Sequence, residues 1–340
     1  MKVMEIRDGW GLDHLVAGTR RDPPEPGADE VVVRMEAASI NYRDFVMVAG
    51  GYGRRGGRLP IIPVSDGAGR VIAIGKDVKS FAIGDLVCPN FAQDWVDGPF
   101  TEQAWVGMLG GYRDGVLQEA MLFPQHGLVR AASHLSALEA ATLPCAALTA
   151  WNALTSADIK PGSTILTQGT GGVSLFALQF AKLFGATVII TSSSDEKLKH
   201  ARELGADETI NYRTDPTWET RAREISGPGG IDLVIELAGA LAQSVKAVKA
   251  GGTVAMIGVL AGPSATIPLG QVVTRAVRLQ GVTAGSRRAF EEMMRAVERH
   301  RLRPVYSVAG RSMEDAPAAI AAIAEGKHFG KICLGFGAHP

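Results

Sequence analysis

Hydrophobic residues follow two different patterns along the chain. In the first third, short apolar runs of the β type, such as residues 30–40 and 68–75, are separated by turns that contain glycine. In the middle, strand-like apolar runs alternate with segments in which apolar residues recur at helical spacing. The first pattern predicts a β-rich domain. The second predicts an α/β domain built on a doubly wound parallel sheet.

The alternating region can be divided into individual elements. Leu175, Leu178 and Leu183 recur at helical spacing, and Ser194 stands where the N-cap of a further helix is expected. A long helix is expected later in the chain, over residues 286–300. The expected strands cover residues 163–168, 186–191, 232–239 and 251–259, and the expected helices between them cover 173–185, 194–205 and 240–251.

Composition and charge narrow the class of protein. The chain has 340 residues, of which 46% are hydrophobic and 21% charged, as expected for a globular protein of two domains. Its formal net charge is zero, so charge favours neither nucleic acid nor a membrane surface as a partner. We find no signal-peptide core and no run near the ~18 apolar residues of a membrane span. Cys88, Cys145 and Cys333 form no C-x-x-C pair, which favours a cytoplasmic location.

A glycine-rich turn joins the strand over 163–168 to the helix that follows it. Gly169 allows a sharp turn, and Gly171 lets the backbone approach a pyrophosphate. Ser174 replaces the third glycine of the dinucleotide fingerprint, and its small side chain predicts wider helix packing without loss of the site. A plain turn is the alternative, but the flanking strand–helix units favour a nucleotide. The predicted phosphate site comprises Gly169, Thr170, Gly171, Gly172 and Val173.

The end of the next strand indicates which nucleotide binds. NAD sites usually carry an acidic residue there, whereas this chain has Ser192 and Ser193, whose hydroxyl groups can donate to a 2′-phosphate. Lys197 lies one turn into the following helix and can reach the same place. Asp195 is the alternative, because a carboxylate turned inward would serve NAD instead. We predict NADPH as the cofactor.

Six stretches resemble the medium-chain dehydrogenase/reductase superfamily, above all its zinc-independent branch of quinone oxidoreductases and 2-enoyl thioester reductases. Together they span nearly the whole chain. They are SINYRDFVMVAGGYG, GAGRVIAIGKDVKSFAIGDLV, ATLPCAALTAWNAL, GTGGVSLFALQFAKLFGA, LGADETINY and HFGKICLG.

The resemblance implies a domain organisation and a partner. A GroES-like substrate domain is expected over residues 1–127 and 286–340, and a Rossmann dinucleotide-binding domain over 128–285. A homodimer is expected to join edge to edge through the last Rossmann strand, within residues 277–285.

The resemblance also extends the cofactor site. In the quinone-reductase branch, a lysine and a tyrosine fifteen residues apart bind the 2′-phosphate, and Lys197 and Tyr212 have that spacing. Gly258 and Lys331 complete the predicted set of cofactor-binding residues.

The zinc ligands of related enzymes are missing from this chain. Zinc members have a cysteine near the position of Asn41, and a Gly-His-Glu where this chain has Ser65 and Asp66. The four cysteines of a structural zinc lobe are absent from residues 90–103. Because hydroxyl and amide groups are poor zinc ligands, we predict that no zinc is bound.

Three residues are candidates for catalysis by resemblance. Tyr52 matches a tyrosine of enoyl thioester reductases that acts as proton donor or anchor, and Asn41 matches a residue that contacts the nicotinamide ribose or the substrate. Thr149 matches a threonine near the nicotinamide. The alternatives are a packed loop aromatic, a turn asparagine and a hydroxyl bonded to its own helix.

Three arginines lie near Tyr52 in the sequence, and their positive charge could attract an anionic substrate. Arg43, Arg54 and Arg55 could serve a carboxylate or a CoA phosphate, and solvated surface arginines are the alternative.

From these residues and the resemblance we predict that the protein uses NADPH to reduce an activated C=C bond. Without a Lewis acid nothing stabilises the alkoxide of a simple alcohol, whereas an enolate can be held by hydrogen-bond donors. The substrate would be a small electrophile, namely an enone, a quinone or an enoyl acid or thioester. A metal-free alcohol or aldehyde dehydrogenase is the alternative, and a non-catalytic nucleotide-binding protein is a third possibility.

Overall fold

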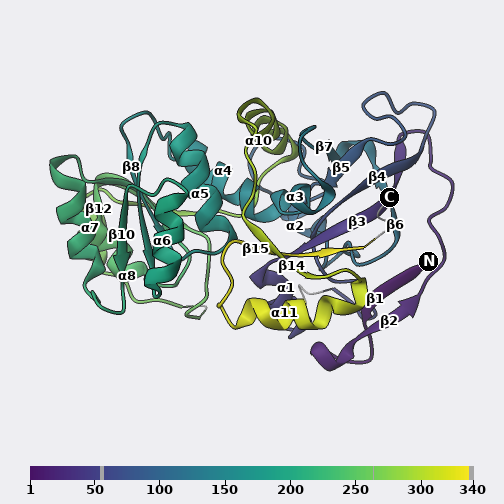
Figure 1. Ribbon diagram of the computed structural model, residues 1–340, viewed down its shortest axis with the longest axis horizontal. Helices are drawn as coiled ribbons and strands as arrows, with labels where there is room; N and C mark the ends of the chain where they lie inside the picture. Colours follow the sequence, from purple (N-terminus) through teal and green to yellow (C-terminus); the bar gives the residue numbers. More distant parts are fainter. Residues whose placement is uncertain (54–56, 263, 337–340) are drawn as a thin grey trace. The chain divides into compact units, whose positions relative to one another are not determined.

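The computed structural model describes residues 1–53, 57–262 and 264–336, so Arg54 and Arg55 lie outside the described residues. The chain divides into two compact units (Figure 1). The first unit comprises Met1–Leu148 and Ala284–Pro340, and the second comprises Thr149–Thr283.

The boundaries of these units differ from those expected from the sequence. Residues 128–148 belong to the first unit, because β7 (Leu128–Arg130) pairs with β5 (Leu86–Pro89) and α3 (Ala137–Ala140) contacts β3 and β4. The second boundary follows Thr283 instead of residue 285. The segment after residue 127 therefore completes the β-rich unit before the second unit begins.

The first unit is built on a seven-stranded sheet. The strand order is β14-β15-β3-β4-β5-β7, and β6 pairs with β3 as well. Two short strands share one edge of the long β3: β6 pairs with its first half and β15 pairs antiparallel with its second half. The strands of this sheet are β3 (Glu30–Ile40), β4 (Asp66–Ile74), β5 (Leu86–Pro89), β6 (Ala120–Pro124), β7 (Leu128–Arg130), β14 (Tyr306–Gly310) and β15 (Lys331–Gly335).

The core of the first unit forms where this sheet meets its helices. Val31, Val33 and Met35 of β3 are buried in one cluster with Ile320 and Ile323 of α11. β3 is buried along most of its length, and Val31, Val33 and Met35, which stand at every second position, share the face that meets α11. The other elements of the unit are β1 (Lys2–Ile6), β2 (Leu15–Thr19), α1 (Tyr42–Val48), α2 (Glu102–Val106), α3 (Ala137–Ala140), a π-helical turn η4 (Leu143–Ala147), α10 (Arg287–His300), α11 (Ala316–Ala324), and the short 3₁₀ turns Leu12–His14, Gln125–Gly127 and Met313–Asp315.

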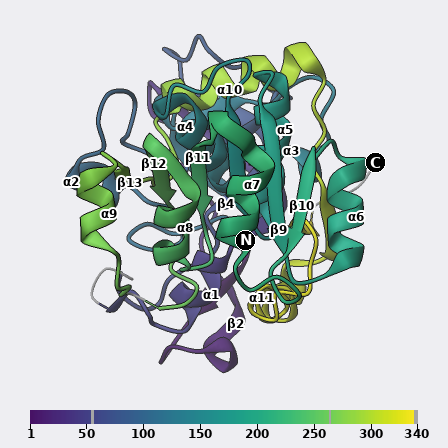
Figure 2. The same cartoon turned by 90° about the vertical axis from the view of Figure 1, so that its left-hand side faces the viewer.

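The second unit is a six-stranded, fully parallel sheet in the order β10-β9-β8-β11-β12-β13. This order is that of a Rossmann fold, so the predicted α/β class is confirmed. In Figure 2, α7 and α8 lie on the near face of the sheet. The strands are β8 (Thr164–Gln168), β9 (Thr187–Ser192), β10 (Glu208–Asn211), β11 (Ile231–Glu236), β12 (Val248–Met256) and β13 (Arg278–Gly281). The helices are α4 (Leu148–Ser156), α5 (Gly172–Leu183), α6 (Asp195–Glu203), α7 (Trp218–Ser226), α8 (Leu241–Ala247) and α9 (Leu269–Thr274), with a 3₁₀ turn at Gly227–Gly229.

One predicted helix in this unit is too long. The helix expected over residues 240–251 ends at Ala247, and β12 begins at the next residue. Val248 is buried and pairs with Ile231, and Gly251 has a left-handed φ of 73° that a helix does not allow. Burial of Val248 against the sheet therefore overrides the helical spacing.

None of the helices in the described ranges combines the length and the apolar content that a membrane span requires.

Candidate cofactor and active sites

The glycine-rich turn of the second unit joins β8 to α5. Gly169 has a φ of 77°, a left-handed conformation that favours glycine, and its N–H donates to Thr191 at the end of β9. Gly171 is the N-cap of α5, so no side chain caps this helix. The predicted phosphate residues thus occupy a strand–turn–helix junction, the arrangement that suits an anion at a helix N-terminus.

Ser174 connects this helix to the strand before it. Its side chain is buried, and Oγ donates to the carbonyl oxygen of Gln168 at 2.6 Å. The serine at the third glycine position therefore satisfies the last carbonyl of β8 and ties the first turn of α5 to it.

A buried hydrogen-bond network closes the same end of the sheet. Gln168 Nε2 donates to Glu236 Oε2 at 2.8 Å, and Glu236 Oε1 accepts from the N–H groups of Gly239 and Ala240. At Gly258 an added Cβ would lie 2.1 Å from the carbonyl oxygen of Leu237, so only glycine fits there. The network joins the ends of β8 and β11 to the start of α8.

The predicted 2′-phosphate residues gather where β9 and β10 end. Ser192 is the buried last residue of β9, and its carbonyl accepts from the N–H of Tyr212 at 3.1 Å. Ser193 follows directly, and Lys197 lies in the first turn of α6, where burial lowers the pKa of its ammonium. The carboxylate of Asp195 instead accepts from the Asn211 side chain at 2.7 Å.

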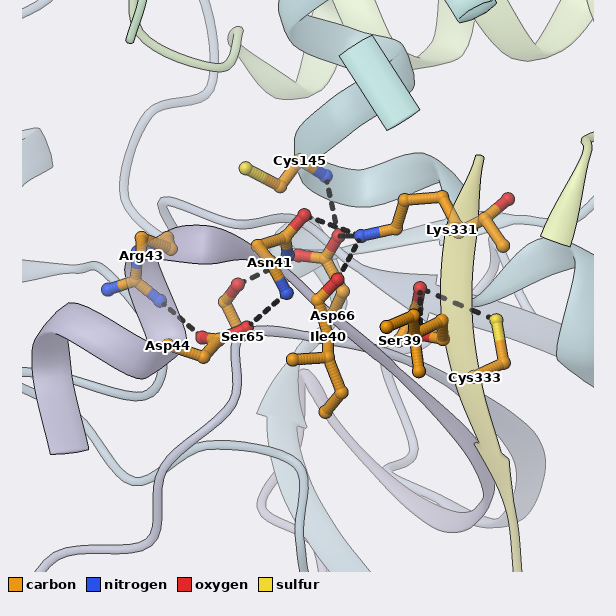
Figure 3. Close-up of polar contacts among 12 residues, drawn as sticks. Ser39, Ile40, Asn41, Arg43, Asp44, Ser65, Asp66, Cys145, Lys331 and Cys333 are labelled. Carbon is orange, nitrogen blue, oxygen red and sulfur yellow. Dashed lines mark hydrogen bonds and ion pairs between the residues drawn. The ribbon is translucent and has the colours of Figure 1, made fainter. Parts of the chain in front are cut away.

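In the first unit, a buried polar cluster forms at the end of β3 and at the starts of β4 and β15 (Figure 3). Lys331, the first residue of β15, is only 3% exposed. Its ammonium donates to Asn41 Oδ1 at 2.5 Å and to the carbonyl of Ile40 at 2.8 Å. It also lies 3.9 Å from Asp66 Oδ2. Lys331, which the sequence analysis places at the cofactor, therefore contributes its charge to this cluster.

Asp66 is the fully buried carboxylate of this cluster. It accepts from Ser65 Oγ at 2.8 Å and from the backbone N–H of Cys145 at 3.1 Å. Burial raises the pKa of Asp66 to about 6, against the opposing effects of the Lys331 charge and of hydrogen bonding to Asn41. The carboxyl group can therefore titrate close to neutral pH.

The first turn of α1 holds Asn41 in place beside this carboxylate. Asn41 is the N-cap, and its backbone N–H donates at 2.7 Å to the carboxylate of Asp44, which is fully buried. Arg43 pairs with Asp44 at 3.1 Å and lies 4.8 Å from the ring centre of Phe91. Arg43 is thus paired with a buried carboxyl group and is not a solvated surface arginine, and its charge still acts on its neighbours.

Tyr52 adjoins the same group of residues. It is half-buried against the core of the first unit, and burial raises the pKa of its hydroxyl, although the charge of Arg43 and hydrogen bonding to it act in the other direction. Asn41 and Tyr52 therefore both neighbour the Arg43–Asp44 pair. Thr149, the third predicted catalytic residue, is buried in the first turn of α4 and belongs to the second unit.

The residues that stand at the zinc-ligand positions of related enzymes, Asn41, Ser65 and Asp66, are bonded to other groups of the protein. Asn41 Oδ1 already accepts from an ammonium, and the Ser65 hydroxyl donates to Asp66. Burial, with the charge of Asp66, raises the pKa of the nearby Cys145 thiol to about 12. Within the described ranges, no group of three or more His, Cys, Asp or Glu side chains is arranged to hold a metal ion.

Sequence reasoning missed much of this cluster. It assigned no role to Asp44 or Cys145, and it treated Asp66 only as a missing metal ligand. Lys331 could have indicated the cluster, because it is the first residue of the apolar strand over 331–335. A lysine that is buried in such a strand needs a polar partner. Gln168 and Glu236 also end apolar strands, and both prove to be buried in a network.

Comparisons with known proteins find two domain families along the chain. A model of the alcohol dehydrogenase GroES-like domain matches residues 27–133, and a model of the zinc-binding dehydrogenase family matches residues 172–299. A zinc-type alcohol dehydrogenase-like protein of Schizosaccharomyces pombe is 42% identical over 304 residues, which cover 87% of this chain and 88% of that protein.

A second curated relative and a solved structure extend the comparison. The 2-methylene-furan-3-one reductase of Solanum lycopersicum is 32% identical, covering 76% of this chain and 62% of the relative. The crystal structure of a putative alcohol dehydrogenase from Sinorhizobium meliloti 1021 is 39% identical, with a TM-score of 0.90 over 98% of both chains. On these matches, the chain belongs to the medium-chain dehydrogenase/reductase superfamily of oxidoreductases.

Proposed function

We propose that the protein uses NADPH to reduce a carbon–carbon double bond conjugated to a carbonyl, without a metal ion. The substrate is an enone, a quinone, or an enoyl acid or thioester. The observation that carries the proposal is the Lys331 ammonium bound to Asn41 at the position where zinc members of the family hold a ligand. This arrangement provides hydrogen-bond donors and a fixed positive charge in place of a metal site.

The chemistry of such a reduction suits these donors. When bound, NADPH supplies the hydride. As the β-carbon accepts it, the electron pair of the double bond moves toward the carbonyl oxygen, which gains negative charge. The Asn41 amide and the Tyr52 hydroxyl carry N–H and O–H donors for that oxygen. A proton then bonds to the α-carbon, with Tyr52 as the proposed donor, since its raised pKa keeps the hydroxyl protonated at neutral pH. The phenolate that remains takes a proton from water and so restores the hydroxyl.

The choice of NADPH rests on the end of β9. Ser192, Ser193, Lys197 and Tyr212 provide hydroxyl groups and a positive charge for a 2′-phosphate. Asp195, the residue that would favour NAD, is engaged by the Asn211 amide at 2.7 Å. The phosphate turn from Gly169 to Val173, with Gly258 beside it, would hold the pyrophosphate.

The name of one relative supports the substrate class. The tomato protein is named for a 2-methylene-furan-3-one, in which a C=C bond is conjugated with a ketone. The name of the Schizosaccharomyces relative favours the second candidate function, a dehydrogenase acting on alcohols and aldehydes. A purely nucleotide-binding role is the third possibility, and turnover of NADPH with any electrophile would count against it.

We also propose a homodimer joined at β13. Within the described ranges, this strand is the last in its sheet and pairs with β12 alone, so its other edge is open to a second copy. The cytoplasmic location stays a prediction from the sequence.

The proposal is tested by a panel of enones, quinones and enoyl-CoA esters set against aldehydes of matched size. NADPH oxidation is followed by absorbance, and products are identified by NMR. Conversion of the enone to the saturated ketone supports the proposal. Reduction of aldehydes alone would favour the alcohol dehydrogenase candidate.

A further inference from the structure

The Lys331 ammonium has a restricted set of partners. It is nearly completely buried, and a lysine ammonium carries three N–H donors and no acceptor. Two of its donors bind the carbonyl of Ile40 and Oδ1 of Asn41. The carboxylate of Asp66 lies 3.9 Å from the ammonium. All of these partners belong to the first unit.

A donor-only neighbour fixes the orientation of the Asn41 amide. An asparagine can present either its oxygen or its nitrogen to a partner, but an ammonium accepts no hydrogen bond and so selects the oxygen. The Nδ2 atom must then point away from Lys331. The charge on the ammonium also polarises the amide, because hydrogen bonds in a chain strengthen one another.

In this orientation the Nδ2 atom of Asn41 is buried and has unfilled hydrogen-bonding capacity. Among the described residues it makes no hydrogen bond of normal geometry, although it lies close enough to Asp66 to lower the pKa of that carboxyl. A primary amide nitrogen has two N–H donors, so one weak contact with Asp66 leaves a donor unfilled. A buried donor without a partner costs free energy, and a bound ligand that supplies the partner is one explanation of such an atom.

We propose that Lys331 is a positioning residue, which locks the Asn41 amide so that Nδ2 donates to the substrate carbonyl oxygen as that oxygen gains negative charge. Asp66 is the counter-ion that holds the ammonium in place. The inference rests on the proposed function, since it needs an oxygen that becomes negative during the reaction. Lys331 and Asp66 touch no reacting atom and act through Asn41.

Two other roles for Lys331 make different predictions. As a phosphate-binding residue of the cofactor site, Lys331 would contribute to NADPH affinity. As a buried ion pair with only a structural role, it would contribute to stability, with no separate effect on turnover.

The experiment compares Lys331→Met and Lys331→Arg with the unmodified protein. We expect Lys331→Met to lower kcat by roughly 10²-fold, the loss typical of a disabled oxyanion donor, with the NADPH dissociation constant changed less than twofold. Arginine also donates only, so Lys331→Arg should recover at least a tenth of the lost activity. Lys182→Met is the matched control, because it removes a lysine paired with Asp207 at the surface and should leave kcat unchanged.

Asn41→Asp covers the case in which Lys331→Met fails to fold. This variant keeps an oxygen for the ammonium and changes the donor Nδ2 into an acceptor. We expect the same loss of kcat with an unfolding temperature no lower than that of the unmodified protein. Unchanged kcat in Asn41→Asp or in folded Lys331→Met overturns the proposal. So does a Lys331→Met variant that loses NADPH affinity tenfold while its kcat holds.

A binding probe separates this inference from the proposed function. 4-Nitrophenolate carries a stable oxyanion, and its absorbance reports its ionisation. We expect the protein to bind it about tenfold more tightly than either Lys331→Met or Asn41→Asp does. If that difference appears but no enone is reduced, the inference stands and the proposed function falls. If enones are reduced and neither variant differs in binding or kcat, the inference falls alone.

Discussion

At the scale of single residues, removal of the Tyr52 hydroxyl tests whether a protein group delivers the proton to the α-carbon of the substrate. Tyr52→Phe keeps the ring that packs on the core and removes only the donor. We expect kcat with the best enone to fall by roughly 10²-fold, with NADPH affinity retained. Steady-state kinetics and a fluorescence titration of NADPH measure the two quantities.

Tyr306→Phe is the control for this variant. It removes the same atom from β14, outside the polar cluster, and should leave turnover unchanged. Full activity of Tyr52→Phe would remove Tyr52 from the mechanism and leave solvent as the source of the proton.

The carboxyl group of Asp66 predicts how activity depends on pH. Its pKa is about 6 in the folded protein, raised by burial above the usual value of about 4. As pH falls through 6 the carboxylate is lost, the Lys331 ammonium loses its counter-ion, and kcat should decline. The charged and titratable groups that act on Asp66 or are acted on by it are Lys331, Asp44, Cys88, Cys145 and Cys333.

The raised pKa of Asp66 also distinguishes loss of activity at low pH from unfolding. Because the folded protein binds this proton more tightly than the unfolded chain, protonation of Asp66 adds stability as pH falls from about 6 to about 4. As pH falls through 6, kcat should therefore decline, while protonation of Asp66 does not lower the unfolding temperature. Asp66→Asn should abolish that acid limb, and a limb that persists unchanged would assign it to another residue.

At the scale of elements, the proposed preference for NADPH over NADH rests on the junction of β9 and α6. Lys197→Ala removes the positive charge in the first turn of α6. We expect NADPH binding to weaken by about 1–3 kcal/mol, the range of a charge-assisted hydrogen bond, and NADH binding to stay unchanged. Isothermal titration with both cofactors measures the difference.

Lys199→Ala is the control, because Lys199 is an exposed lysine of the same helix. Equal affinity of the unmodified protein for NADH and NADPH would contradict the assignment and return Asp195 to the role of ribose ligand.

Local features of these elements follow from the sequence, whereas long-range pairings do not. The strand over residues 30–40 and the helix cap at Ser194 could be predicted, because a short β-type apolar run and side-chain capping are local properties. The end of α8 could not, since Val248 becomes a strand residue only by pairing with Ile231. The Lys331–Asn41 contact joins residues far apart in the chain, and no local pattern reports such a pairing.

At the scale of the whole molecule, the open edge of β13 predicts a dimer. Within the described ranges β13 pairs with β12 alone, and an open edge of a parallel sheet is a surface on which a second copy can add. Light scattering at micromolar concentration should give twice the mass of one chain, which is 35.8 kDa. A single-chain mass at that concentration would contradict this interface.

The central claim is metal-free reduction of a conjugated C=C bond, and one measurement tests it most directly. The protein is freed of metal with a chelator and given NADPH and an enone, and the product is analysed by NMR. We predict a saturated ketone with its carbonyl intact, formed at the rate seen before chelation, and less than a tenth of a zinc ion per chain by elemental analysis. Activity found only with aldehydes and alcohols, and lost with about one zinc per chain on chelation, would contradict the account.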